Sequence, residues 1–290
     1  MILKKTTLTT AIVFSLLCLT LATPGFAQKA PVEIEASRQL EWLRDKNMYR
    51  ATGDVVITQG DTVIKGDMAE AEYDAAVGPS ALTLFTVTGN VVMTKPDQTV
   101  HADKGVYDTR TEVLTLYGDI VTLKTPTMTV TSTGGMAYDA AKGRATARGN
   151  AKVQEATRTI KADVITAFIS KNSNKLDRAT ADGHVLITMD GKEGKDIAQA
   201  DQGDYDLVKD TISLRGNVKL TRGSNHMQGD YATINLTTGV SSLQNSPKAG
   251  GRVRAIFSSG DSKTPLPNVT GSVPMVNSKK DFEQPYAVGR

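Results

Sequence analysis

Apolar residues recur at every second position in six short stretches of the chain, and each stretch begins at a glycine. The six glycines are Gly53, Gly89, Gly118, Gly149, Gly183 and Gly216. The second and fourth residues after them are apolar in eleven of twelve cases, and these pairs are Val55/Ile57, Val91/Met93, Ile120/Thr122, Ala151/Val153, Val185/Ile187 and Val218/Leu220. Successive side chains of a strand point to opposite faces, so a period of two predicts strands with one buried face.

The same alternation continues on the N-terminal side of the glycines. The apolar pairs there are Phe85/Val87, Leu114/Leu116, Ala145/Ala147, Ala179/Ala181 and Ile212/Leu214. Each glycine is therefore expected inside a long strand, where glycine commonly marks a bulge or a bend. A tight turn at the glycine and the Asp or Asn after it is the alternative. The apolar alternation on both sides favours the bend.

An aromatic residue precedes each glycine and keeps the same phase. The six aromatic residues are Trp42, Tyr73, Tyr107, Tyr138, Phe168 and Tyr205. The separation is 11 residues in four units and longer in the other two, which contain insertions at residues 78–80 and 172–174. Insertions are best tolerated at loop tips, so these departures fit a repeat of strands and turns. Residues 40–48 keep the phase through Trp42 and are predicted as strand and turn.

About six strand–turn repeats make up the body of the chain, at intervals of 29 to 36 residues between glycines. A single hairpin cannot bury its apolar face, whereas stacked units can. The sequence therefore predicts an all-β, elongated, solenoid-like stack with two facing sheets. Such an open stack has unpaired edge strands at its two ends, which favour pairing with another copy or a similar partner.

The two ends of the chain differ from this body. Residues 1–27 contain Lys4 and Lys5, an apolar run over residues 11–22 and the small-residue site Gly25-Phe26-Ala27, which together are typical of a secretory signal peptide. The body is predicted over residues 28–257, with one last strand within residues 252–257. Residues 258–290 are rich in Ser, Pro, Asn, Gly and Lys and are predicted to be a disordered tail. That tail is either a solvated extension or a segment that contacts anionic lipid or a partner.

Cysteine and charge narrow the class of protein. The only cysteine, Cys18, lies within the predicted signal peptide, so disulfides and thiol chemistry are not expected in the exported chain. An exported protein without disulfides fits a bacterial envelope protein better than a disulfide-stapled secreted domain. The formal net charge is +3, but residues 247–290 carry seven Lys or Arg against three Asp or Glu. The body is therefore slightly acidic, which is unlike a nucleic-acid-binding domain.

No constellation of residues predicts catalysis, a metal or a cofactor. His101, His184 and His226 lie far apart in the sequence, and His184 takes the Asp or Asn place after a repeat glycine, as a turn residue would. A ladder of these three histidines on a metal ion is the less favoured interpretation. The chain also contains neither a phosphate-binding glycine loop nor a nucleophile elbow. A β-helix hydrolase would require a cluster of carboxylates on one outer face, and it is the remaining enzymatic alternative.

Several motifs occur together in phase behind the signal peptide. They are Ala-Asp or Gly-Asp strand openings, a spaced tyrosine and Gly-Asn-Val strands, as in residues 102–107, 89–91 and 216–218. Together they resemble the OstA/LptA-like family of lipopolysaccharide-transport proteins, over roughly residues 31–257. The resemblance implies a β-jellyroll, or twisted half-pipe, in the periplasm. It also implies a carrier without enzymatic activity, whose apolar interior holds the acyl chains of lipid A.

The resemblance further implies partners and a binding face. The partners are lipopolysaccharide, an inner-membrane anchored LptC-like protein, an outer-membrane LptD-like assembly protein and further copies stacked end to end. The expected lipid-binding residues are the inward apolar positions Val55, Ile57, Phe85, Val87, Val91, Met93, Leu114, Leu116, Ile120, Val153, Val185, Ile187, Ile212, Leu214, Val218 and Leu220.

Two questions stay open at this level. Small inward residues in the middle units, such as Ala145, Ala147 and Ala181, either leave room for lipid or let the walls close. A β-solenoid scaffold or adhesin with a sealed, dry core is accordingly the alternative to a lipid carrier. Six units are also more than the short members of the family would need, so this chain is expected to span a greater length per protomer.

Overall fold

The computed structural model describes residues 31–257 except residues 172, 174, 192, 193, 239 and 246–251. The predicted signal peptide and tail therefore lie outside the described residues. All described residues belong to one compact unit, residues 1–258. In the part of the chain that is described, no helix is long and apolar enough to cross a membrane.

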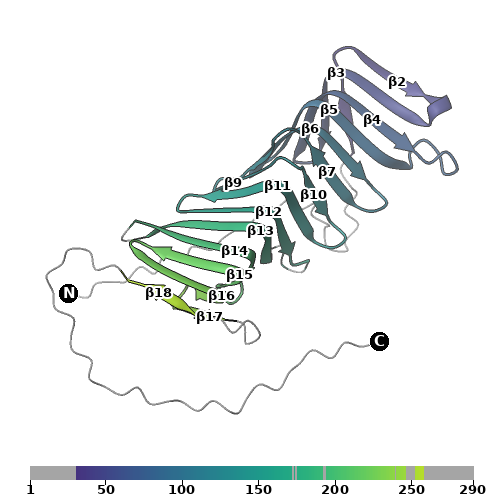
Figure 1. Ribbon diagram of the computed structural model, residues 1–290. Coiled ribbons are helices and arrows are strands. Elements are labelled where there is room, and N and C mark those ends of the chain that lie inside the picture. The colour runs from purple at the N-terminus through teal and green to yellow at the C-terminus, as the bar shows by residue number, and fades with distance from the viewer. Residues whose placement is uncertain are drawn as a thin grey trace, which may run out of the picture. The chain divides into compact units, whose positions relative to one another are not determined.

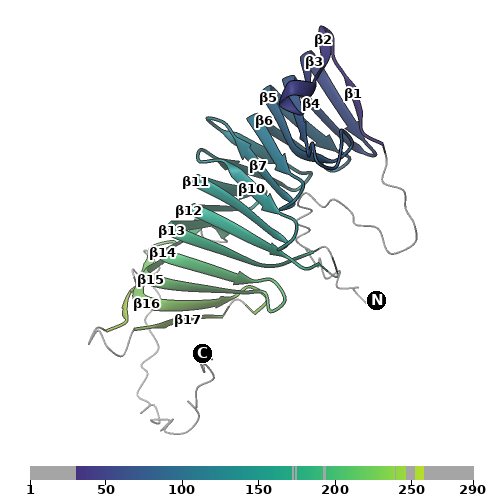
Figure 2. The ribbon, with the colours of Figure 1, turned by 90° about the vertical axis from the view of Figure 1, so that its right-hand side faces the viewer.

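The described chain is almost entirely antiparallel β-structure, as predicted. The elements are β1 (Glu33–Glu35), β2 (Gln39–Leu43), the short 3-10 helix η1 (Arg44–Lys46), β3 (Met48–Gln59), β4 (Thr62–Tyr73), β5 (Leu82–Lys95), β6 (Gln98–Asp108), β7 (Val113–Tyr117), β8 (Val121–Lys124), β9 (Met128–Ser132), β10 (Met136–Asp139), β11 (Arg144–Glu155), β12 (Arg158–Ile169), β13 (Leu176–Gly191), β14 (Gly194–Asp206), β15 (Thr211–Arg222), β16 (Asn225–Asn235), β17 (Ser241–Gln244) and β18 (Arg254–Ile256). Each long strand pairs with its sequence neighbours, so the strands follow one another in chain order (Figures 1 and 2).

The repeat glycines bend these strands, as the two-sided alternation predicts. The pairing register skips two residues at five of them, for example between Thr88 and Val91 of β5. Gly89 and Asn90 occupy the skipped positions, with φ angles of 78° and 48°. Both angles lie in the left-handed region, which glycine adopts freely and which Asn and Asp tolerate better than other residues. The Gly-Asn motif therefore encodes a bulged corner rather than a hairpin turn.

An aspartate on the return strand completes the corner. Asn90 Nδ2 donates to the Asp67 carboxylate at 3.1 Å, and Asn217 Nδ2 donates to Asp201 Oδ2 at 2.8 Å. At the third corner, the backbone N–H of Asp119 donates to Asp103 Oδ2 at 3.0 Å. These aspartates are the second residues of the Gly-Asp and Ala-Asp strand openings. The Gly-Asp or Ala-Asp pair of one strand and the glycine motif of the neighbouring strand thus form these corners together.

The corners divide the sheet into two facing walls. The first wall consists of β2, β7, β10, β17 and the halves of the long strands that pair with them, and the second wall consists of β1, β8, β9, β18 and the other halves. Residues of the second wall next to the corner are fully buried, such as Val55 and Val185. On the adjacent strand, the cross-strand partner of Val55 is Gly66, and that of Val185 is Ala200. A large residue opposite a small one lets the walls converge there, and burial of each valine contributes about 1.5–3 kcal/mol.

The stack also contains two tandem halves. Gly105 pairs with Leu116 and Gly203 pairs with Leu214, so the pattern recurs after 98 residues. Tyr107 and Tyr205 are related in the same way and face the same side of their strands. Equivalent positions of the two halves can therefore be compared directly.

Substitution of Gly89 by alanine should destabilise the protein by about 1–3 kcal/mol, because a left-handed φ strains an alanine. The added Cβ would also lie 2.1 Å from Asp67 Oδ2. Gly203→Ala is the matched control, since its Cβ would have 3.5 Å to the nearest side chain. The free energy of unfolding from urea titration measures both changes. Equal stability of the two variants would contradict the corner model.

His184 stands at the position after the repeat glycine that Asp or Asn takes at the other corners. It makes its own corner sensitive to pH. Its Nδ1 lies 2.8 Å from Asp163 Oδ2, and this hydrogen bond, followed by the carboxylate charge, raises the pKa of His184 above 6.5. The stabilisation from the charged pair is complete below the unfolded pKa of about 6.5 and is lost as the pH rises through the folded value. An NMR titration should give a raised His184 pKa that falls in Asp163→Asn. An unchanged pKa in that variant would contradict the pairing.

Candidate apolar binding site

The space between the two walls is lined by apolar side chains from every strand. One row of inward side chains runs along the first wall near the open side, with the buried Tyr73 and Ile169 one inward position beyond it. Its consecutive cross-strand partners are Trp42, Tyr49, Ala71, Phe85, Tyr107, Leu114, Tyr138, Ala145, Ala167, Ala179, Tyr205, Ile212 and Ile234. Tyrosine suits such a boundary because its ring packs against apolar groups and its hydroxyl reaches water or a polar partner.

Small side chains interrupt this row in the middle of the stack. Ala145, Ala167 and Ala179 are direct cross-strand neighbours there. Ala147, next to Ala145 on the same face of β11, is also buried. Where tyrosine or phenylalanine fills the space between the walls elsewhere, these alanines leave it empty.

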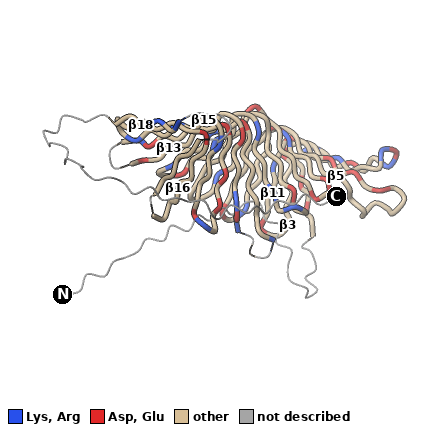
Figure 3. Tube along the Cα trace, turned by 60° about the horizontal axis from the view of Figure 1, so that its bottom comes forward, with Lys and Arg blue, Asp and Glu red and all other residues tan. Residues whose placement is uncertain are grey.

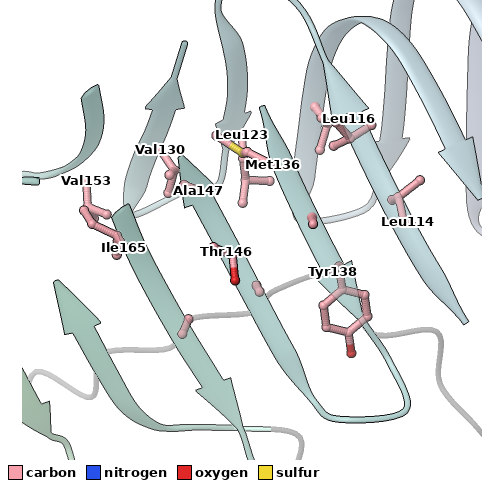
Figure 4. Close-up of a pocket in the computed structure, with 14 residues that line it drawn as sticks. Leu114, Leu116, Leu123, Val130, Met136, Tyr138, Thr146, Ala147, Val153 and Ile165 are labelled. Carbon is pink, nitrogen blue, oxygen red and sulfur yellow. The ribbon is translucent and has the colours of Figure 1, made fainter. Parts of the chain in front are cut away.

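The larger cavity lies beside these alanines and has a volume of about 60 Å³. A single water molecule needs about 10–15 Å³ by the same kind of measure, so the space is larger than a packing gap between side chains. Figure 4 shows Leu114 and Leu116 from β7, Met136 and Tyr138 from β10 and Ile165 from β12 around it. The opposite lining comes from the second wall: Val100, Leu123, Val130 and Val153. The cavity is therefore a gap between the walls rather than a defect within one.

A second cavity of about 10 Å³ lies nearer the N-terminal edge and is lined by Ile57, Phe85 and Val87, among others. Beside it, Trp42 stacks on Tyr49 with ring centroids 5.7 Å apart, and Trp42 Nε1 donates to the Tyr73 hydroxyl at 3.2 Å. This aromatic cluster fills the space that remains open in the middle of the stack.

The structure places fifteen of the sixteen predicted binding positions on the inward face. Leu114, Leu116 and Val153 line the larger cavity, and Ile57, Phe85 and Val87 line the smaller one. The other nine belong to the packed core outside both cavities: Val55, Val91, Met93, Val185, Ile187, Ile212, Leu214, Val218 and Leu220. The predicted face is thus continuous, but only part of it is open.

The prediction for Ile120 was wrong. Ile120 is 62% exposed, whereas Val121 is fully buried. Three residues, Gly118 to Ile120, separate β7 from β8, whereas two residues are skipped at the other corners. The extra residue shifts the inward positions to Val121 and Leu123.

The return strands also line the cavity, and none of their residues was among the predicted binding positions. Val100, Val130 and Ile165 line the cavity from β6, β9 and β12. Their apolar neighbours two residues away, such as Ala102 and Ala167, carry the same alternation. That period was present in the sequence, but no glycine marks the start of these strands.

A contact between an arginine and a tyrosine joins the walls across the open side. The Arg158 guanidinium of the second wall lies 5.5 Å from the ring centre of Tyr205 in the first wall. Arg158 Nη2 donates to Glu155 Oε2 at 2.8 Å, and the Tyr205 hydroxyl donates to Asp210 Oδ1 at 2.8 Å. Burial, then the bond to Asp210, raises the pKa of Tyr205 to about 12, so its hydroxyl stays protonated. This strap of Glu155, Arg158, Tyr205 and Asp210 closes the trough on the C-terminal side of the larger cavity.

Charged groups lie mainly outside the trough. Figure 3 shows Lys and Arg interspersed with Asp and Glu along the described strands, without a band of a single sign. Within the described part of the chain, no three His, Cys, Asp or Glu side chains come close enough together to hold a metal ion. His101, His184 and His226 lie on β6, at a corner and on β16, and all three side chains are outside the trough.

One family of known proteins matches most of the described chain. The family model described as "LptA/(LptD N-terminal domain) LPS transport protein" matches the chain twice, over residues 33–133 and 130–240. Among solved structures, LptH from Pseudomonas aeruginosa, the LptA homologous periplasmic component of the conserved lipopolysaccharide transport device, is 14% identical. That match covers 46% of this chain and 95% of LptH, with a TM-score of 0.40. No curated protein matches the chain.

The Glu155→Gln substitution should weaken the strap. The Arg158 side chain is only 11% exposed, so it would lose its charged partner while remaining largely out of water. We expect a loss of about 1–3 kcal/mol in the free energy of unfolding. Lys209→Ala is the control: its partner is Asp206, its side chain is 77% exposed, and such surface pairs contribute little to stability. Similar small effects in both variants would show that Arg158 is not held by Glu155.

Proposed function

We propose that this chain, which belongs to the LptA/LptD N-terminal family of lipopolysaccharide-transport proteins, carries lipopolysaccharide through the periplasm. In this proposal the acyl chains of lipid A lie between the two walls and the sugars lie outside them. The protein acts as a carrier and not as an enzyme. The two tandem matches to the family model support a carrier of double length.

The observation that carries the proposal is the apolar cavity between the walls. Its lining is almost wholly apolar and includes the small residues Ala145, Ala147 and Ala167 together with Tyr138. Transfer of an alkyl chain from water into such a space gains about 0.8 kcal/mol per buried CH₂. A polar head group would remain in water at the edge of the walls. An amphiphile with a long acyl chain fits this division better than a compact polar ligand.

The ends of the stack support the bridging part of the proposal. Among the described residues, β1 and β2 pair only with β3, and β17 and β18 pair only with β16. The free sides of these edge strands can pair with further copies or with the LptC-like and LptD-like partners. A row of such units would form one apolar path between the inner and outer membranes.

The sealed-core scaffold is the second candidate, and a specific observation favours it. Nine predicted lining residues are packed in the core, and the strap closes the trough at Arg158. If the walls never separate, the cavity stays isolated and holds no lipid.

Photo-crosslinking distinguishes the two candidates. A photo-reactive residue is placed in living cells at Met93, Val153 or Ile187, which face inward, and at Val92, Gln154 or Leu186, which face outward. A carrier gives lipopolysaccharide adducts at the inward positions, most strongly at Val153 in the cavity, and few at their outward neighbours. Adducts only within the protein at all inward positions would refute lipid carriage and support the scaffold.

A further inference from the structure

One buried polar side chain faces the trough without a partner. Gln98 begins β6 and is 7% exposed, and it shares the inward face of that strand with Val100 and Ala102. Its Oε1 is, among the described residues, the one buried side-chain oxygen or nitrogen that lacks a hydrogen bond. A buried acceptor without a donor costs about 1–3 kcal/mol, so Gln98 needs an explanation.

In the second tandem half, the polar side chain at the equivalent position has a hydrogen-bond partner. Asp196 lies 98 residues after Gln98, two positions before the inward Ala198, and accepts a bond from Arg222 Nε at 3.0 Å. The third corner contains one extra residue, so the residue equivalent to Arg222 in the first half is Thr125. Thr125 lies two residues after the inward Leu123, as Arg222 lies two residues after the inward Leu220. The polar residue at this edge is therefore hydrogen-bonded to another side chain in the second half.

Thr125 cannot serve Gln98 in that way because its hydroxyl is committed to its own turn. Its Oγ1 accepts from the backbone N–H of Met128 at 3.2 Å and donates to the Met128 carbonyl at 3.4 Å. The first half thus lacks the charged pair, and it has a buried hydrogen-bond acceptor in its place.

The unpartnered Gln98 lies next to residues that line the larger cavity. Val100 and its cross-strand partner Leu123 line the cavity from the second wall. Gln98 is the next inward residue on β6 toward the open side. An alkyl chain that fills the cavity and leaves it at this edge passes the Gln98 amide where the chain joins its polar head.

We propose that Gln98 Oε1 accepts a hydrogen bond from the ligand, donated by an O–H or N–H group at the start of its apolar chain. The site then selects amphiphiles with a hydroxyl or an amide N–H at that point over those with a plain ester. The inference rests on the proposed carrier function and adds the chemical group that is recognised. Gln98 is a specificity-determining residue in this arrangement, and the cavity supplies the affinity.

Two ligands of nearly equal shape test the inference. N-methyl dodecanamide has an N–H where methyl dodecanoate has an ester oxygen, and both carry the same alkyl chain. The dissociation constants of both are measured by calorimetry for the full chain and for Gln98→Leu. The amide-to-ester preference should be about three- to tenfold greater in the unmodified protein than in Gln98→Leu, because a net hydrogen bond contributes about 0.5–1.5 kcal/mol.

The control is Gln154→Leu, the same substitution at an exposed outward position, which should leave the preference unchanged. Thermal unfolding should show Gln98→Leu to be at least as stable as the unmodified chain, since it removes an unsatisfied acceptor. Should it not fold, Gln98→Met removes the acceptor with a more adaptable side chain and carries the same expectation.

The outcomes separate this inference from the proposed function. If both ligands bind and the preference is the same with and without Gln98, the inference is overturned while the carrier function stands. If neither ligand binds the unmodified protein, the trough is sealed to acyl chains and both proposals fail.

Discussion

The bulged corner is the constraint on which the rest of the structure depends. Two successive left-handed residues, such as Gly89 and Asn90, turn a strand whose pairing continues on both sides of them, and Asp67 on the neighbouring strand holds the turn. Because the corner recurs at almost the same place in each strand, a single continuous sheet supplies both walls. The apolar face of that sheet is then folded onto itself, and its burial stabilises the stack without disulfides.

Each half of the corner constrains the other through close contact. The backbone at Gly89 approaches the Asp67 side chain so closely that a Cβ would overlap it. Gly66, just before Asp67, lies opposite Val55 at the convergence of the walls and has Val87 against it. Glycine, aspartate and a small residue therefore act together at this corner, whereas Ser37 and Thr133 take the place of the aspartate at the corners of Asp54 and Asn150.

Much of this fold could be predicted from the sequence because the alternation and the glycine lie in one strand. Val55 and Ile57 face inward as the period of two requires. The failure at Ile120 has a local cause: one additional residue at a corner reverses every side chain beyond it, and no residue type announces the insertion. The cavity depended instead on pairs distant in sequence. That Val100 and Val153 face Leu114 across a gap follows from how closely the walls approach, which depends on the volumes of many side chains at once.

The same geometry explains why the trough is open in one place and closed in another. Tyr107 and Tyr205 occupy equivalent positions in the two halves, yet only Tyr205 meets an arginine across the open side. Arg158 is held by Glu155 and cannot withdraw without leaving that carboxylate. A chain that moved from the cavity toward the C-terminal edge would have to displace this contact. In the proposed carrier, passage along the trough is therefore governed less by the apolar lining, which is continuous, than by the few polar groups at its edge.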